Sequence, residues 1–490
     1  MGGHIVMKAN EIKNRIVMPA VLLSAVLIVV SGCSFIPEYK RPDAPVEKKF
    51  SGSNTEESNQ KPPLWSDYFG DADLEALIDL AMKNNRDVRI AAQKIVSMRA
   101  MYGIQKAAQL PTVSAGGSFN RSLTASSLSP TQDPLYATQY QVSLGISSWE
   151  LDFWGRIESM KQMAQEAYFS TIQGQRSTYL SLVTQISQSY LLQSELEQRI
   201  QIAEGTLKIR SEGLRIARRR FEVGVGTKID VTQTEILHNQ ALLELANLRK
   251  QSAQNMNALV LLVGTSFPSI KIKPLNEIEQ YFQKEIPAGL PSDLILNRPD
   301  ILSSEHMLKK ANANIGAARA AYFPRISLTA GFGQGSSDLG NLFKGDEQLW
   351  NFSPSVYIPI FTGGRLDATL DMAKSQRDSA IATYEKTIQT AFKEVSDVLA
   401  DKYWTHEQLK IQKNTLAAQT ERSEIAQARY KKGSSSYFEV LDAERERFTV
   451  EQSIVQLRRS YLTTSVTLFS TLGGEYAVKE DTDKQPTKAE

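Results

Sequence analysis

Two stretches of the chain alternate apolar and polar residues with a period of two. In the first stretch the runs cover about residues 111–121 and 138–151, and in the second about 325–335 and 351–361. This period predicts β-strands with one apolar and one polar face. Runs of roughly 9–12 residues also match the length of a tilted strand that crosses a membrane. The alternation alone fits two ordinary hairpins with one hydrated face equally well.

Long proline-free stretches rich in Ala, Leu, Gln, Glu, Arg and Lys follow each pair of strands. These residues favour helix, so we expect one long helix before the turn at Gly224 and another before the turn at Gly433. If continuous, each would be about 100 Å long. Return helices are expected over about 228–262 and 437–472, where narrow apolar stripes fit coiled-coil packing.

The pattern occurs twice because the sequence is duplicated. Asp87 matches Asp300 at an offset of 213 residues, and Gly224 matches Gly433 at an offset of 209 residues. A coherent offset over such a distance indicates a tandem duplication. Each repeat is expected to hold a first helix, two strands, a long helix and a return helix, with the first helices over about 71–106 and 292–320.

The predicted organisation has six parts. In chain order they are a lipoprotein signal peptide (1–32), a lipidated extended segment (33–70), the first repeat (71–264), an inter-repeat segment (265–291), the second repeat (292–472) and a C-terminal tail (473–490). Sequence alone leaves open whether Met1 or Met7 is the true start.

The signal peptide is predicted from an apolar run, 16–30, that follows basic residues and ends in Val30-Ser31-Gly32-Cys33. The run is about 15 residues long, too short to span a membrane comfortably. Small residues before Cys33, the only cysteine in the chain, resemble the bacterial lipobox. That resemblance implies a diacylglycerol and an N-acyl chain, such as palmitate, on Cys33. Ser34 at the next position implies sorting to the outer membrane of a Gram-negative bacterium. The alternative is an ordinary signal peptide with a chance cysteine.

Composition and motifs exclude several classes of protein. The balance of 56 basic and 54 acidic residues gives no case for binding nucleic acid, and 41% hydrophobic content with a mean hydropathy of −0.30 excludes a polytopic helical membrane protein. The sequence lacks GxSxG, HExxH, P-loop and CxxC motifs, and its four histidines are scattered. We therefore expect no enzyme, no metal and no cofactor apart from the covalent lipid.

Four strands cannot close a barrel in a membrane. An open edge leaves backbone groups unpaired in lipid, and single-chain barrels need at least about eight strands. If the strands span a membrane, the protein must be a cyclic oligomer. A dimer, a trimer and a tetramer all satisfy this rule.

Several longer motifs carry a resemblance to a known family. They are PEYKRPDAP after Cys33, WELDFWGRIES at 149–159, GLPSDLILNRPDI at 289–301, and RYKKG followed by VLDAER within 429–445. Over nearly the whole mature chain, the sequence resembles the TolC/OprM family of outer-membrane efflux ducts, in its lipoprotein branch. The resemblance implies an α+β membrane protein, a tandem-repeat protomer with four strands. Three protomers would form a 12-stranded β-barrel continuous with a long periplasmic α-helical barrel.

The resemblance also implies a function. The protein would be a homotrimeric exit duct, anchored among outer-membrane lipids, of a tripartite system that expels drugs or other small toxic compounds and so confers multidrug resistance. Its partners would be a periplasmic adaptor, or membrane fusion protein, and an inner-membrane resistance-nodulation-division pump. Two alternatives remain at this point: an outer-membrane component of a type I protein-secretion system, and a periplasmic coiled-coil scaffold or adaptor lipoprotein.

Carboxylates lie just beyond both glycine turns. Glu439 and Asp442 are three residues apart and share a helix face, as do Asp442 and Arg445, while Asp230 is the first-repeat counterpart of Glu439. Acidic residues favour the first turn of any helix, so simple capping is the alternative explanation.

The resemblance implies that these turns are the periplasmic tip where the duct closes. Asp442, Arg445, Glu439 and Tyr430 match gate residues of the family, with Asp230 in a lesser role. Ser435 stands where TolC-type members carry a gate arginine, so that contact is absent here. Three copies of each carboxylate near one axis would repel one another and attract cations, and pairing of Asp442 with a neighbouring Arg445 would offset the repulsion.

Overall fold

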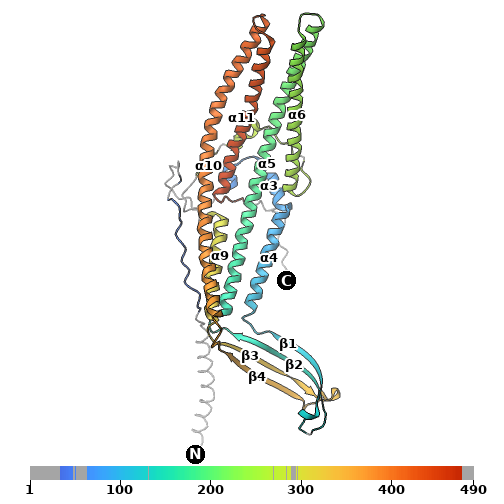
Figure 1. The fold of residues 1–490 in the computed structure, drawn as a ribbon, viewed down its shortest axis with the longest axis vertical. Helices are drawn as coiled ribbons and strands as arrows, with labels where there is room; N and C mark the ends of the chain where they lie inside the picture. The colour runs from blue at the N-terminus through green and yellow to red at the C-terminus, as the bar shows by residue number, and fades with distance from the viewer. Residues whose placement is uncertain are drawn as a thin grey trace, which may run out of the picture. The chain divides into compact units, whose positions relative to one another are not determined.

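The computed structural model describes residues 34–47, 50, 63–130, 132–268, 270–282, 284–287, 294 and 296–476 (Figure 1). The expected signal peptide and Cys33 lie outside these residues. The chain divides into two units: Met1–Pro42, Val96–Ser170 and Glu305–Thr383 form the first, and Asp43–Ile95, Thr171–Ser304 and Tyr384–Glu490 form the second.

The two repeats contain helices and a pair of strands in a similar order. The helices are α2 (Trp65–Tyr68), α3 (Ala72–Asn84), α4 (Arg86–Ala107), α5 (Arg156–Glu222), α6 (Lys228–Val263), α7 (Leu275–Ile278), α9 (Pro299–Ala320), α10 (Arg365–Lys431) and α11 (Tyr437–Thr471). The strands are β1 (Val113–Thr124), β2 (Leu135–Leu151), β3 (Arg325–Ser336) and β4 (Gln348–Tyr357). Short 3-10 helices are η1 (Ser126–Leu128), η2 (Glu279–Phe282) and η3 (Leu339–Asn341).

The first unit holds one antiparallel sheet in the order β1-β2-β3-β4. Each of the four predicted runs overlaps one strand, with ends that differ by up to four residues. The last run was expected to reach residue 361, but β4 ends at Tyr357. Pro359 explains this error, because proline has no N–H group to donate to the ladder.

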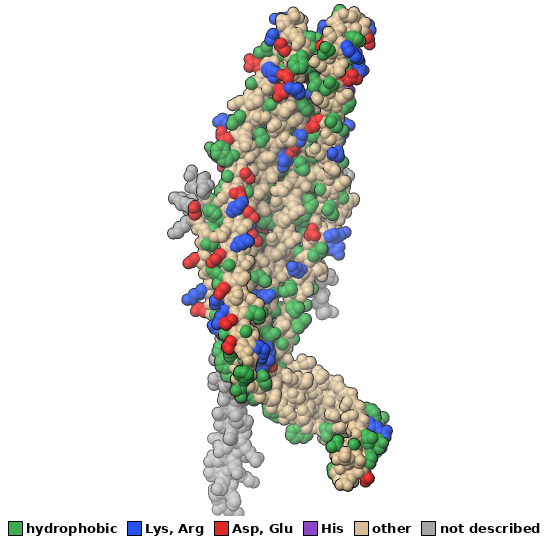
Figure 2. All heavy atoms as spheres, viewed as in Figure 1, with side chains coloured by type: hydrophobic (Ala, Val, Ile, Leu, Met, Phe, Trp, Pro, Cys, Tyr) green, Lys and Arg blue, Asp and Glu red, His purple; other side chains and the backbone are tan. Residues whose placement is uncertain are grey.

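The register gives the sheet two chemically different faces. One cross-strand row is apolar and consists of Ala115, Leu144, Phe332 and Trp350. The next row on the opposite face is small or polar and consists of Ser114, Gly145, Gly331 and Asn351. On the apolar face Trp350 is 77% exposed. On the side visible in Figure 2, the charged side chains of the sheet region gather at its loop end.

The helix expected over 71–106 is interrupted. It forms α3 and α4, which are separated by Asn85 in an extended conformation. The Asn85 side chain accepts hydrogen bonds from the amides of Asp87 and Val88, so it caps α4. The corresponding helix was expected over 292–320, but its main part, α9, begins only at Pro299.

In both repeats, a side chain at the interruption donates a hydrogen bond to a carbonyl at the end of the return helix, α6 or α11. Asn85 Nδ2 donates to the carbonyl of Leu262 at 2.7 Å, and Arg298 Nη1 donates to the carbonyl of Thr471 at 3.0 Å. Two residues beyond these carbonyls, Gly264 and Gly473 end α6 and α11 with φ of 76° and 75°. The duplication therefore extends to individual tertiary contacts.

An aromatic cluster joins three separate parts of the chain within the second unit. Trp65 lies 4.1 Å from Phe69 and 5.3 Å from Phe469, measured between ring centroids. Phe69 also lies 5.6 Å from Phe282, which follows the first repeat, and Tyr476 lies near Trp65. The amide of Trp65 donates to the carbonyl of Glu475. The segment before α3, the inter-repeat segment and the C-terminal end thus share one core.

Both hairpins have small apolar cores. In the first, Leu196, Ala203, Leu245 and Leu248 pack together between α5 and α6, and in the second, Leu409, Val450 and Ile454 pack between α10 and α11. Spaced apolar pairs of this kind follow the narrow stripes seen in the sequence. Among the helices of the described residues, none has the length and apolar character needed to cross a membrane.

Candidate functional site: the hairpin tips

The two helical hairpins turn in the same way. Gly224 lies in the turn after α5 with φ of 78°, and Gly433 lies in the turn after α10 with φ of 73°. In each hairpin the amide of the residue after this glycine bonds to the carbonyl five residues earlier, at 3.0 Å. This is a left-handed C-terminal cap, which glycine adopts without steric cost. Both turns lie where the sequence predicts them.

At the first tip, Asp230 caps its own helix. Its carboxylate accepts from the amide and the hydroxyl of Thr227, at 3.1 and 2.8 Å, and its amide donates back to the Thr227 hydroxyl. The two residues form a capping box, which satisfies exposed amides of the first turn. Asp230 therefore has the simple capping role that the sequence left as an alternative.

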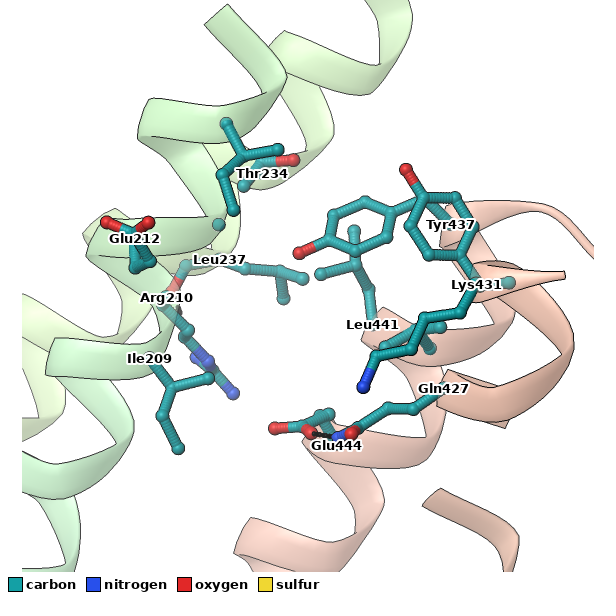
Figure 3. A pocket seen from close by; sticks show the side chains of 14 residues that line it. Ile209, Arg210, Glu212, Thr234, Leu237, Gln427, Lys431, Tyr437, Leu441 and Glu444 are labelled. Carbon is teal, nitrogen blue, oxygen red and sulfur yellow. Dashed lines mark hydrogen bonds between the residues drawn. The ribbon is translucent and has the colours of Figure 1, made fainter. Parts of the chain in front are cut away.

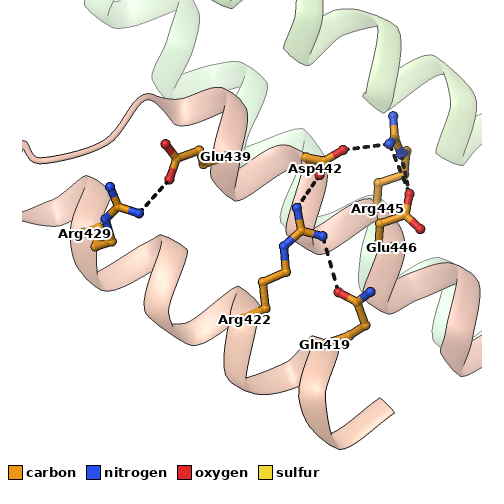
Figure 4. Close-up of polar contacts among 7 residues, drawn as sticks. All are labelled: Gln419, Arg422, Arg429, Glu439, Asp442, Arg445 and Glu446. Carbon is orange, nitrogen blue, oxygen red and sulfur yellow. Dashed lines mark hydrogen bonds and ion pairs between the residues drawn. The ribbon is translucent and has the colours of Figure 1, made fainter. Parts of the chain in front are cut away.

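The second tip uses its carboxylates differently. Glu439, the counterpart of Asp230, does not cap α11 but pairs with Arg429 of α10 at 3.2 Å (Figure 4). Ser436 precedes α11 without a capping hydrogen bond from its side chain. The buried hydroxyl of Ser435 has no hydrogen-bond partner within the described part of the chain.

Asp442 is the centre of the second tip. Its two carboxylate oxygens accept separately, one from Arg445 at 2.7 Å and the other from Arg422 of α10 (Figure 4). Arg445 also contacts Glu446 at 3.1 Å. The pairing of Asp442 with Arg445 expected at the tip forms here within one chain, between residues three apart on α11.

The sequence reasoning missed Arg422, although a signal was present. In a hairpin of two antiparallel helices, residues at similar distances from the turn lie beside each other. Arg422 precedes Gly433 by 11 residues, and Asp442 follows it by nine. The predicted turn at Gly433 therefore already placed these two opposite charges across the hairpin.

Tyr430 links the second hairpin to the first. Arg220 of α5 donates a hydrogen bond from Nη1 to the Tyr430 hydroxyl, and its Cζ lies 5.6 Å from the centroid of the Tyr430 ring. On the other side, Tyr430 packs 4.9 Å from the ring of Tyr437. The expected gate residue Tyr430 is thus a contact between hairpins, and its partner Arg220 was not foreseen.

These contacts are suited to being broken. The side chains of Arg422, Arg445 and Arg429 are about half exposed, whereas that of Asp442 is 24% exposed. Ion pairs at such positions contribute about 0.2–1 kcal/mol each and weaken with salt. Among the described residues, no group of three or more His, Cys, Asp or Glu could hold a metal ion. The contacts at the tip are therefore weak polar contacts that can form and break reversibly.

The sheet and the repeated hairpins together define an outer-membrane channel protein, as the sequence predicted for the fold class. A family model described as outer membrane efflux protein matches residues 77–265 and again 290–474, and the chain belongs to this family. The repeated match agrees with the predicted duplication.

Individual relatives are similar along almost their whole length. The probable efflux pump outer membrane protein TtgC of Pseudomonas putida is 40% identical over 92% of this chain and 94% of its own. The outer membrane protein OprJ of Pseudomonas aeruginosa is 36% identical over 93% of this chain and 96% of its own.

Solved structures are similar to the same extent. A membrane protein from Pseudomonas aeruginosa has a TM-score of 0.84 and 36% identity, covering 90% of this chain and 100% of that chain. The open state of the MtrE outer membrane channel of Neisseria gonorrhoeae has a TM-score of 0.82 and 33% identity, covering 90% of this chain and 98% of that chain. The protein is thus an efflux channel of the outer membrane.

Proposed function

We propose that three copies of the chain form a passive exit duct of a tripartite efflux system. The observation that carries this proposal is the two-faced sheet with free edges at β1 and β4. β1 and β4 run in opposite directions because consecutive strands are antiparallel, so β4 of one copy can pair antiparallel with β1 of the next. Three copies would give 12 strands, with the apolar row facing lipid and the polar row facing water.

A lipid on Cys33 is part of the proposal. Phe35, two residues after the cysteine, stacks on Phe323 at 4.6 Å, two residues before β3 begins. Ile36 packs against Gly316, where an added Cβ would lie 2.5 Å from it. The start of the mature chain is therefore held beside the sheet, where a lipid on Cys33 would enter the same membrane. Cys33→Ser behind a cleavable signal should remove the lipid and keep the trimer, and loss of the trimer would contradict a purely anchoring role.

The partners we propose are a periplasmic adaptor and an inner-membrane resistance-nodulation-division pump. TtgC is named as an efflux pump component, and a second relative of 40% identity is named as the toluene efflux pump outer membrane protein TtgI. These names support small toxic compounds as cargo. The duct would contribute no catalysis, because the pump drives transport.

We further propose the hairpin tips as the gate. Asp442 with Arg445 and Arg422 would close the second hairpin, Glu439 with Arg429 would support it, and Tyr430 would join the hairpins. Docking of the adaptor would supply the small free energy needed to break these exposed contacts.

The proposal is tested by purification and by complementation. The protein should be extracted from the outer membrane as a trimer that forms pores in planar bilayers. A strain lacking its own duct should regain resistance to toluene-like compounds when it carries this gene together with its pump and adaptor genes. A detergent-independent monomer would contradict the duct and favour the scaffold lipoprotein. Rescue of protein export alone would favour type I secretion.

A further inference from the structure

A cavity of about 320 Å³ lies between the two hairpins, close behind their tips (Figure 3). Pockets for small molecules begin at about this volume. The aliphatic part of the lining comes from both hairpins and consists of Ile209, Ile216, Leu237, Val440 and Leu441. Tyr430, which joins the hairpins, also lines this cavity, whereas Asp442, Arg445 and Arg422 do not.

The absence of a side chain at Gly213 leaves room for the Tyr437 hydroxyl in the cavity wall. Gly213 lies in the wall, and a Cβ there would approach the Tyr437 hydroxyl to 2.7 Å. Tyr437 is partly buried, and this burial raises the pKa of its hydroxyl. The phenol thus stays neutral and leaves an apolar ring in the lining.

The guanidinium of Arg210 is buried beside this apolar space and has few hydrogen-bond partners. Arg210 is only 9% exposed, and Nη1 donates to the carbonyl of Leu237 at 2.9 Å. Its Cζ also lies 5.6 Å from the centroid of the Phe448 ring. Burial lowers the pKa of the Arg210 guanidinium, although the nearby Glu444 opposes this. Its other N–H groups donate to no acceptor in the described part of the chain, so the guanidinium can still bind an anion.

The lining has three further charged side chains, those of Lys431, Glu444 and Glu212. Lys431 also lines the cavity, and no carboxylate of the described residues lies within ion-pair distance of it (Figure 3). Glu444 already accepts from Gln427 at 2.5 Å and from Ser423 at 3.4 Å. Glu212 is held by two hydrogen bonds from Arg215, at 2.8 and 2.6 Å. Glu212 is thus paired with a cation, whereas Glu444 accepts only from neutral donors, so the lining holds two cations without an ion pair among the described residues against one such carboxylate.

We propose that this cavity binds a small amphipathic anion, with its carboxylate, sulfonate or phosphate group on Arg210 and Lys431 and its apolar body among the aliphatic residues. The charge-assisted bonds to Arg210 would fix the head group, and burial of the body would supply most of the affinity. The proposal concerns the hairpins in the arrangement that the structure shows, and binding to that arrangement can be measured whether or not their separation opens the duct.

The test uses 8-anilino-1-naphthalenesulfonate with the full protein in amphipol. Fluorescence titration should show one saturable site per protomer. Arg210→Gln should weaken this binding about tenfold or more, as expected for a lost hydrogen bond to a charged group. Val440→Trp should abolish binding by filling the cavity. The matched control, Arg219→Gln, removes the same charge from a residue outside the cavity lining, whose partner Glu222 also lies outside it, and should bind like the wild type.

A second probe separates charge from hydrophobic binding. N-phenyl-1-naphthylamine has the same aromatic body without the sulfonate and should bind at least tenfold more weakly, with no response to Arg210→Gln. Equal binding of the two probes, or wild-type affinity in both Arg210→Gln and Val440→Trp, would overturn the proposal. If Arg210→Gln fails to assemble, Arg210→Lys replaces it. Lysine keeps the charge but loses the planar fork, so binding should weaken by a smaller factor, and unchanged affinity would overturn the role of Arg210.

Discussion

Arg220 of α5 donates a hydrogen bond to the hydroxyl of Tyr430 of α10, across 210 residues of sequence. The same guanidinium lies over the Tyr430 ring, so hydrogen bonding and a cation–π contact act on one pair. This pair ties the tip of the first hairpin to the tip of the second. Any movement that separates the hairpins must break it.

The first prediction concerns this pair. Tyr430→Phe keeps the ring and removes the acceptor, at a cost of about 0.5–1.5 kcal/mol to the closed tip. Single-channel recordings in planar bilayers should then show roughly a 2–10-fold rise in the ratio of open to closed states. Arg220→Gln should have a similar or larger effect, and the double variant should show less than the sum of the two. Arg219→Gln, whose charge pairs with Glu222 on the same helix, is the control and should leave the recordings unchanged.

The second prediction concerns Asp442. Replacing Asp442 and Arg445 together by alanine should raise single-channel conductance, because the contact to Arg422 is lost as well. Arg422→Gln alone should give a smaller rise in the same direction. Raising the salt concentration should increase wild-type conductance by more than the rise in bulk conductivity, and this excess should vanish in the double variant.

Lys432→Gln provides the control for this second experiment. It removes a charge at the same tip, and Lys432 forms no ion pair among the residues that the structure describes. Its conductance should match that of the wild type. If Lys432→Gln and the double variant behaved alike, general charge at the tip would explain the effect, and Asp442 would lose its special role.

Local patterns in the sequence were sufficient for much of the fold. The strands follow from alternation, and the turns follow from Gly224 and Gly433, because both signals depend on neighbours along the chain. The break at Asn85 was missed. Asn85 sits inside a helical pattern, and its Nδ2 acceptor is the carbonyl of Leu262, 177 residues away.

The candidate site divides in the same way. The pair of Asp442 and Arg445 follows from spacing on one helix, and Arg422 follows from the symmetry of one hairpin. The contact between Arg220 and Tyr430 depends on how two separate hairpins pack, which no local pattern determines. Asp230 and Glu439 are equivalent in sequence, and each follows a hydroxyl residue at the N-cap, yet one caps its helix and the other binds Arg429, so the local sequence does not determine the difference.

The third prediction concerns the glycines that end the return helices. Gly473 has φ of 75°, and a Cβ there would meet the carbonyl oxygen of Asn297 at 2.8 Å. Gly473→Ala should therefore lower the free energy of unfolding by more than the roughly 1–2 kcal/mol of left-handed backbone strain. Gly264→Ala should behave alike, since its Cβ would meet the Asn84 carbonyl oxygen at 2.6 Å.

Urea denaturation monitored by tryptophan fluorescence provides the measurement. Gly174→Ala is the matched control, because Gly174 lies within α5 and a Cβ there meets nothing within 4 Å. Alanine is the better helix former by about 1 kcal/mol, so this variant should be neutral or more stable. Equal effects at Gly174 and Gly473 would exclude the close approach as the cause.

The fourth prediction is a pH dependence at the start of the mature chain. Arg41 pairs with Glu305 at 2.8 Å, and Lys309 pairs with the same carboxylate at 3.0 Å. Burial alone would raise the pKa of Glu305, but the bonds from Lys309 and Arg41 hold it below its ordinary value of 4.5. A depressed pKa in the folded state stabilises this contact above the unfolded value, and the stabilisation is lost as the pH falls through the folded value.

Hydrogen exchange of residues 34–47 as a function of pH would measure this effect. Corrected for intrinsic exchange rates, protection should be constant from neutral pH down to about pH 4.5 and should then fall as Glu305 becomes protonated. Glu305→Gln should show reduced protection already at neutral pH and little further change on acidification. Glu38→Gln, in the same segment, should retain the wild-type profile. A wild-type profile in Glu305→Gln would mean that Phe35 and Ile36 hold the segment by packing alone, because their contacts with Phe323 and Gly316 carry no charge.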